Sequence, residues 1–351
     1  MSNDCVSGRA AKWLLESGIQ EPGGGVARYY RTDVQRNQPV STEITGYGVS
    51  AFLYLHQPAA ALKAAEFLLK AWDGSAMAFE LESAPDDRFT YFFDCGIIVR
   101  GLLGAWRYTG SPELLDVAAA IGKSMACDFA DGGDDYHPIL TLPQKQPVPR
   151  DPLRWSRTTG CYQVKAALAW QELFEATGET LFEQCYGQAV EAGLRDYTSF
   201  LPGHSERAKV VDRLHAFLYF LEGLLPRAQD PACADALRNG IAAVEHLLKD
   251  TAAEFERSDV YAQLLRIRIF ADWAGAVPLD RQAAEQEAAA LARFQAHHDD
   301  PRIDGGFYFG RAAGVWLPFI NPVSTAFAVQ ALGLWSRYSG GGSPQCWHLL
   351  I

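Results

Sequence analysis

Residues 43–72 read EITGYGVSAFLYLHQPAAALKAAEFLLKAW and contain two helical patterns of different kinds. From Pro58 to Trp72, apolar residues fall on one face and lysine and glutamate on the opposite face, which predicts an amphipathic helix with one exposed side. Glu43–Leu55 is instead apolar on nearly every side, and such a helix must be buried on every side. The stretch therefore predicts a hairpin of one buried and one half-exposed helix.

The same alternation recurs along the chain with a period of roughly 55 residues. Half-exposed helices are predicted at Ala10–Ser17, Pro58–Trp72, Pro112–Phe129, Glu179–Phe200, Pro231–Lys249 and Asp280–Gln295. Buried helices are predicted at Glu43–Leu55, Phe92–Tyr108, Thr159–Ala176, Val210–Leu225, Asp259–Trp273 and Val323–Tyr338. Neither end has the polar capping repeat that an open solenoid needs. We therefore expect an all-α closed ring of six helical hairpins, with residues 1–340 as one domain and 341–351 as a C-terminal tail.

The connections between the predicted helices are of unequal length. Those that lead from a half-exposed helix to a buried one are mostly long, and those in the other direction are short. In a closed ring, all the long loops then lie on one face, where the buried inner helices begin. Long loops in a compact domain usually carry function. The long loops are 18–42, 73–91, 130–157 and 298–322.

The composition excludes several kinds of partner. The 351 residues carry 31 basic and 42 acidic side chains, a net charge of −11, which is poorly suited to nucleic acid. No apolar run has the length of a membrane span, and no signal or cofactor motif is present. Seven cysteines without a CxxC spacing are typical of reduced thiols and a cytoplasmic protein. We expect no cofactor and no bound metal.

Polar residues on the predicted buried helices identify a candidate catalytic set. It comprises Glu43, Asp94, Asp212 and His215. Acids near a helix start also serve as caps or interact with the helix dipole, so capping is the alternative interpretation of the three carboxylates. Capping does not account for His215, which lies deeper. Acids crowded around one opening would raise the pKa of some members and so provide an acid/base pair.

Further polar and aromatic residues on the helices and in the long loops are candidates for substrate binding. They are Tyr47, Trp155, Arg157, Asp259, Arg266 and Tyr308. Aromatic walls with carboxylates suit a sugar ring, and they suit a polyprenyl chain almost as well. Loop arginines and the helix N-termini would favour an anion such as a uronate.

Four segments resemble the (α/α)6-toroid superfamily, which includes six-hairpin glycosidases, unsaturated glucuronyl hydrolases, N-acylglucosamine epimerases and terpene cyclase and prenyltransferase toroids. The segments are PVSTEITGYGVS (39–50), FFDCGIIVRGLLGAWRYTG (92–110), RLHAFLYFLEGLL (213–225) and GGFYFG (305–310). Two of them are also similar to bacterial toroid proteins linked to polysaccharide biosynthesis. The resemblance implies two concentric rings of helices with the site at the axis.

The residues present discriminate among these relatives. Residues 131–135 read DGGDD, which lacks the acid motif of terpene cyclases, and Asp94 directly precedes Cys95, unlike the zinc ligands of prenyltransferases. The epimerases carry paired axial histidines, of which only His215 is evident. Axial aspartates of the kind that uronide hydrolases use are available. We therefore predict a hydrolase, lyase or epimerase that acts on a glycan or uronic-acid-containing saccharide. The alternatives are an isoprenoid-handling toroid and a non-catalytic binding or scaffold toroid, and no oligomeric state is predicted.

Overall fold

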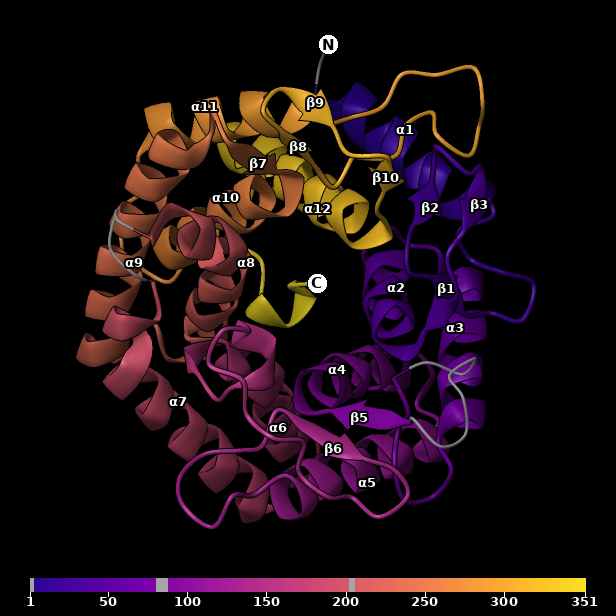
Figure 1. Cartoon of the computed structure of the whole chain (residues 1–351), viewed down its shortest axis with the longest axis vertical. Coiled ribbons are helices and arrows are strands. Elements are labelled where there is room, and N and C mark those ends of the chain that lie inside the picture. The colour runs from indigo at the N-terminus through magenta and orange to yellow at the C-terminus, as the bar shows by residue number, and fades with distance from the viewer. Residues whose placement is uncertain (1–2, 80–87, 202–205) are drawn as a thin grey trace. The chain divides into compact units, whose positions relative to one another are not determined.

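Alternating buried and half-exposed helices make up most of the computed structural model, which describes residues 3–79, 88–201 and 206–351 (Figure 1). Within these ranges there are twelve α-helices. They are α1 (Asn3–Glu16), α2 (Thr42–Tyr54), α3 (Pro58–Ala71), α4 (Phe92–Thr109), α5 (Pro112–Asp128), α6 (Val164–Thr177), α7 (Thr180–Phe200), α8 (Arg207–Gly223), α9 (Pro231–Thr251), α10 (Ser258–Trp273), α11 (Arg281–Ala292) and α12 (Pro322–Ser339).

The two predicted kinds of helix are confirmed. In α3 the buried residues are Ala61, Ala64, Ala65 and Leu68, a single stripe at helical spacing. In α10 every residue from Ser258 to Ala271 is buried. The boundaries differ most at α1, which begins seven residues before the predicted Ala10, and at α6, where a 3-10 turn over Cys161–Gln163 precedes the α-helix. That turn follows Gly160, whose backbone is extended.

The chain divides into two compact units. Unit 1 comprises Met1–Ile19, Arg28–Gln38 and Ser199–Ile351, and unit 2 comprises Gln20–Ala27 and Pro39–Thr198. Each contains three buried helices with half-exposed helices packed against them. The prediction of one domain over residues 1–340 stays a prediction. Among the helices of the described residues, none is long and apolar enough to cross a membrane.

In unit 2 the buried helix α4 packs between α2 and α6. The contacts are close because glycines lie in them. A Cβ atom on Gly101 would stand 2.7 Å from the carbonyl oxygen of Gly46 in α2, and one on Gly96 would stand 2.4 Å from that of Ala166 in α6. Gly104 faces α2 as well, where a Cβ atom would stand 3.0 Å from the side chain of Leu53.

In unit 1 the buried helix α10 packs between α8 and α12. Helices α9 and α11 pack against α10 as well, and α1 packs against α12. The last residues of the chain form a 3-10 turn over Trp347–Leu349, followed by the buried Leu350 and Ile351. The segment predicted as a tail is therefore folded against the helices of unit 1.

Short strands in the long loops lie before the buried helices of each unit. In unit 2, β5 (Phe89–Tyr91) pairs with β6 (Ile139–Thr141), and β1 (Val26–Ala27) pairs with β4 (Val40–Ser41). In unit 1, β7 (Phe255–Arg257) pairs with β8 (Gly310–Ala312), which pairs with β9 (Val315–Trp316). A further sheet has the order β10 (Phe319–Ile320), β2 (Tyr30–Arg31), β3 (Arg36–Asn37). Part of the predicted loop 73–91, residues 80–87, lies outside the described residues.

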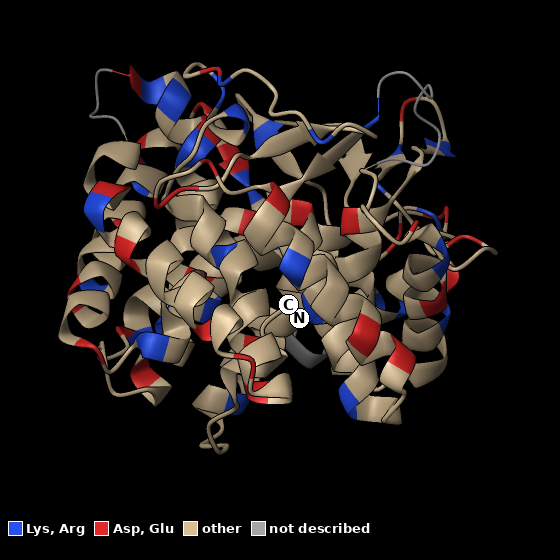
Figure 2. Cartoon of the chain, turned by 90° about the horizontal axis from the view of Figure 1, so that it is seen from below, with Lys and Arg blue, Asp and Glu red and all other residues tan. Residues whose placement is uncertain are grey.

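Charged residues follow the exposed sides of the helices. Figure 2 shows basic and acidic residues interspersed along them. Some charges are nevertheless buried between helices, and several of these have a partner of opposite sign. In unit 2, Glu172 of α6 accepts hydrogen bonds from Arg100 and Arg107 of α4, at 2.7 and 2.5 Å. Buried ion pairs of this kind hold neighbouring helices in one register.

Candidate active site

A largely buried group of three charged or polar side chains lies at the start of α10 and beside the middle of α8 in unit 1. Arg257, the last residue of β7, donates hydrogen bonds from Nε and Nη2 to the two carboxylate oxygens of Asp259, at 2.9 and 2.5 Å. Its Nη1 atom lies 2.8 Å from Nδ1 of His215 in α8. The side chains of Arg257 and Asp259 are only 11% and 7% exposed. A single guanidinium therefore connects two of the predicted site residues.

The hydrogen bond from Arg257 determines the state of the His215 ring. A guanidinium carries only donors, so Nδ1 of His215 must accept, and the proton of the neutral imidazole is then on Nε2. Burial, and next the positive charge of Arg257, hold the pKa of His215 well below its ordinary value, against the opposing effect of the Asp212 backbone carbonyl. His215 is therefore an uncharged hydrogen-bond donor at neutral pH.

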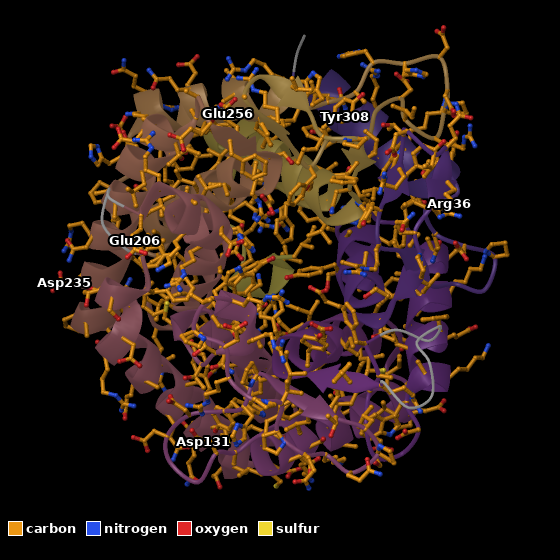
Figure 3. All side chains as sticks on the ribbon, viewed as in Figure 1. Arg36, Asp131, Glu206, Asp235, Glu256 and Tyr308 are labelled. Atoms are coloured by element: carbon orange, nitrogen blue, oxygen red, sulfur yellow. The ribbon has the colours of Figure 1, made fainter. Side chains whose placement is uncertain are left out.

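Aromatic residues of the 298–322 loop lie beside this group. The guanidinium carbon of Arg257 is 4.4 Å from the ring centre of Phe309. The ring of Tyr308, labelled in Figure 3, stacks on that of Trp316 with the centres 5.1 Å apart. The Ser258 hydroxyl, next to Asp259 in the chain, donates to the Tyr308 carbonyl at 2.8 Å. These bonds fix the aromatic loop at the N-terminus of α10.

Asp212 lies one helical turn before His215 on α8, as predicted. Asp212 is exposed, whereas His215 is buried, with 7% of its surface accessible. The contact between the two residues is made by the backbone carbonyl of Asp212. The carboxylate of Asp212 makes no hydrogen bond or ion pair within the described ranges, so it remains available to a ligand.

Arg266 occupies a different, fully buried network. Its Nη2 atom donates to Glu222 of α8 at 2.5 Å, and Nη1 donates to Gln330 of α12 at 3.0 Å and to the Ile351 carbonyl at 3.3 Å. The guanidinium also lies 3.8 Å from the ring centre of Phe327. These contacts join α8, α10 and α12 to the end of the chain. We find Arg266 in a helix-packing arrangement, separate from the group around His215.

In unit 2 the predicted residues lie around Tyr162. Asp94, in the first turn of α4, is 7% exposed and adds to the effect of burial and of Cys161 in raising the pKa of Tyr162. The indole of Trp155 meets the ring of Tyr162 edge-on at 5.0 Å. Tyr162 in turn donates from its hydroxyl to the Thr158 carbonyl at 2.9 Å. Asp94 and Trp155 therefore flank one buried phenol.

The remaining predicted residues of unit 2 differ in exposure. Glu43 is half-buried in the first turn of α2, and Tyr47, one turn later, is 2% exposed. No side chain caps α2, α4 or α10, so the acids at their starts are not N-cap residues. Arg157 is half-buried in a 3-10 turn over Trp155–Arg157. Its Nε atom is buried and makes no hydrogen bond to any residue in the described ranges.

Arg257 and Lys165 are two charged residues that were not predicted from the sequence. Arg257 organises the unit 1 group, and the signal that could have identified it is an arginine two residues before the acid that begins a buried helix. Lys165 is fully buried in the first turn of α6. No cluster of three or more His, Cys, Asp or Glu among the described residues could hold a metal ion.

Comparison with known proteins gives matches in structure. No protein-family model matches the sequence, and no curated protein matches it significantly. Cellobiose 2-epimerase from Bacillus thermoamylovorans is similar over 94% of this chain and 99% of its own, with a TM-score of 0.70 and 12% identity. A D-mannose isomerase is similar over 95% and 97%, with a TM-score of 0.68 and 10% identity. The fold is an (α/α)6 toroid. A polysaccharide lyase shares it over 98% of this chain and the whole of its own, with a TM-score of 0.63 and 11% identity.

The toroid assignment agrees with the resemblance noted in the sequence. In this fold, six buried helices form an inner ring and six half-exposed helices an outer one. The buried set here comprises α2, α4, α6, α8, α10 and α12, each of which follows one of the predicted connections from a half-exposed helix. The fold and its helix assignment were therefore predicted correctly.

Proposed function

We propose that this toroid is an enzyme that acts on a saccharide by proton transfer, with His215 and Asp212 at the reacting atoms. The observation that carries the proposal is the 2.8 Å contact between Nη1 of Arg257 and Nδ1 of His215, from which we infer a neutral ring with its proton on Nε2. Support comes from the structurally similar proteins. They include an epimerase, an isomerase and a lyase, whose names give a sugar or a polysaccharide as the substrate.

A neutral His215 ring favours epimerisation and elimination, which both begin with removal of a proton from carbon, over hydrolysis. A neutral imidazole that donates from Nε2 polarises a carbonyl or carboxylate oxygen as charge develops on it. A base then removes the proton from the adjacent carbon. The exposed carboxylate of Asp212, one turn away, is our candidate base. Asp259 is bound to Arg257 through both oxygens and has the role of orienting it. Epimerisation or elimination therefore suits unit 1 better than hydrolysis.

Aromatic and cationic residues provide the recognition that such a substrate needs. We propose that Tyr308 contacts a sugar face in unit 1, since flat rings match the apolar faces of pyranoses. Within unit 2, taken by itself, Trp155 presents a similar ring beside Tyr162, and the half-buried Arg157 matches the carboxylate of a uronic acid. Glu43, Tyr47 and Asp94 remain proposed contributors of unit 2, to be tested separately.

The proposal is tested with a panel of reducing saccharides and uronates in deuterated water. We include cellobiose and mannose because they are named in the similar proteins, together with unsaturated and saturated uronic-acid disaccharides. Epimerisation through carbon deprotonation places deuterium at the carbon next to the carbonyl, which NMR detects, while elimination creates a new double bond. We expect one of these signals with the wild-type protein. His215→Gln and Asp212→Asn should each reduce its rate at least about a hundredfold, the usual range for acid/base groups.

Asp235→Asn is the matched control, because Asp235 is an exposed residue of α9 paired only with Arg238. It should leave the rate unchanged. Glu43→Gln, Asp94→Asn and Arg157→Gln test unit 2 in the same assay. Turnover that survives both His215→Gln and Asp212→Asn would contradict the assignment in unit 1. Cleavage of a glycosidic bond without deuterium incorporation or a double bond would make the protein a hydrolase and favour the carboxylates of unit 2.

A further inference from the structure

A recess lies in unit 1, between the half-exposed helices α9 and α11. It has a volume of about 370 Å³, within the usual range of small-molecule sites. Its walls are two stripes at helical spacing, with α10 and β7 at its base. The lining residues are Glu245, Leu248, Lys249 and Ala252 from the end of α9, Ala283, Gln286, Glu287, Ala290 and Arg293 from α11 and its end, Tyr261 and Leu264 from α10, and Glu256 from β7.

This recess is distinct from the group around His215. Successive residues of a strand point to opposite sides. In β7, Arg257 binds His215 and Asp259, whereas the preceding Glu256, which is labelled in Figure 3, lines the recess. Nothing in the proposed reaction uses the recess, so its polar groups need a separate explanation.

The three carboxylates of the recess already have partners within the protein. Glu245 accepts from Lys249 at 2.7 Å and from Arg268 of α10 at 2.6 Å. Glu287 accepts from Nε of Arg268 at 2.8 Å. Glu256 accepts from the Tyr261 hydroxyl at 2.7 Å and from Arg311. A cationic ligand would therefore have to displace an arginine or a lysine.

Arg293 is the exception among the charged residues of the recess. It is exposed at the end of α11, and its guanidinium makes no hydrogen bond or ion pair with any residue in the described ranges. The recess also has apolar lining residues, among them Leu248, Leu264 and Ala290. An apolar floor with one unpaired cation at its edge complements a molecule that has an apolar body and one negative group.

We propose that the recess between α9 and α11 binds a small amphipathic carboxylate, with its apolar chain along α10 and its carboxylate on Arg293. The carboxylate gains a charge-assisted hydrogen bond, and the chain removes apolar surface from water. This proposal does not depend on the proposed reaction, because none of the residues of the reaction lines the recess.

The charge state of Glu287 provides a second readout. Burial, against the effect of Arg268, raises the pKa of Glu287 to about 7. Arg268 of α10, Glu245 of α9 and Asp280 before α11 act on the charge of Glu287, and the other charged residues that line the recess are Lys249, Glu256 and Arg293. Because ionised Glu287 repels a carboxylate, binding should be tighter at pH 6 than at pH 8.

The test is calorimetric titration of the full chain with octanoate. We expect saturable binding with a stoichiometry of one. Arg293→Gln should weaken it about tenfold, the effect of one charge-assisted contact. Ala290→Phe, which fills the recess, should abolish it. Arg238→Gln, an exposed arginine of α9 outside the recess, is the matched control and should bind as the wild type does.

Three results would overturn the proposal. They are no saturable binding of octanoate at pH 6, equal weakening by Arg238→Gln and Arg293→Gln, and tighter binding of octyltrimethylammonium than of octanoate. Circular dichroism of each variant establishes that it is folded. His215→Gln should bind octanoate normally, so that loss of turnover and loss of this site are separate outcomes.

Discussion

Arg257 determines the chemistry of its neighbour through the kind of hydrogen bond that it can form. It only donates, so His215 has to accept at Nδ1 and carry its proton on Nε2. It also compensates Asp259, which would otherwise be an unpaired carboxylate on a side chain that is only 7% exposed. A lysine at this position could not bind both partners through a planar fork. The neutral histidine is therefore a consequence of one residue that the sequence pattern did not single out.

The lowered pKa of His215 predicts how stability depends on pH. The unfolded histidine takes up a proton near pH 6.5, whereas the folded one resists it. Wild-type stability should therefore fall as the pH drops below 6.5, by up to about 1.4 kcal/mol per pH unit until the folded pKa is reached. In His215→Gln this contribution is absent. Urea denaturation at pH 7.5, 6 and 5 measures the difference in unfolding free energy between the wild type and His215→Gln. If this difference is the same at all three pH values, the lowered pKa of His215 is contradicted.

Among the elements, the contact between α2 and α4 depends on two glycines. Gly101→Ala should destabilise the protein by about 2 kcal/mol, because the new methyl group meets the backbone of Gly46. Gly8 of α1 is the matched control, since a Cβ there has no neighbour within 4 Å. Gly8→Ala should stabilise by about 0.5–1 kcal/mol through helix propensity. Thermal unfolding of both variants checks the pair, and equal effects would show that α2 and α4 do not pack this closely.

For the ion-pair cluster of α9, α10 and α11, we predict that stability changes with pH in the direction opposite to that expected for His215. Arg268 is shared by Glu245 and Glu287, and burial raises the pKa of Glu287 from 4.5 to about 7. The folded state then binds a proton more tightly than the unfolded state. Relative to Glu287→Gln, the wild type should lose up to about 3 kcal/mol between pH 4.5 and 7. Glu285→Gln, on the exposed side of α11, should show no such trend in the same denaturation series.

For the whole molecule, the helices were predictable because the pattern of apolar residues alone distinguishes half-exposed helices from buried ones, and the two kinds alternate along the chain. Helices apolar all round, such as Asp259–Trp273, have to be buried wherever the chain places them. The site was less accessible to such reasoning. A polar residue on a buried helix faces either a ligand or a neighbouring helix, and Arg266 and His215 look alike in the sequence. Only their partners distinguish them. Glu222, the partner of Arg266, is 44 residues away in the sequence, and Arg257, the partner of His215, is 42 residues away.

Thiol reactivity tests burial over both units at once. Six described cysteines are free: Cys127 and Cys346 are exposed, and the other four are buried. Burial raises the pKa of Cys95 to about 12 and that of Cys233 to about 11, which slows their reaction further. The side chain of Cys5 lies outside the described residues, so the measurement uses Cys5→Ser protein. A chromogenic disulfide reagent should titrate two thiols rapidly in the native state and six in denaturant. Fewer than six in denaturant would indicate native disulfides.

The central claim is that a neutral His215 donates from Nε2 to a saccharide. The direct measurement is ¹⁵N NMR of the histidine rings between pH 6 and 8, with assignment by His215→Gln, before and after addition of a saccharide that the protein turns over. The account predicts that His215 is protonated only at Nε2 throughout, and that its Nε2 resonance moves with saccharide while Nδ1 stays bound to Arg257. A ring protonated at Nδ1 at pH 7, or a His215 signal unmoved by a saccharide that is turned over, would contradict it.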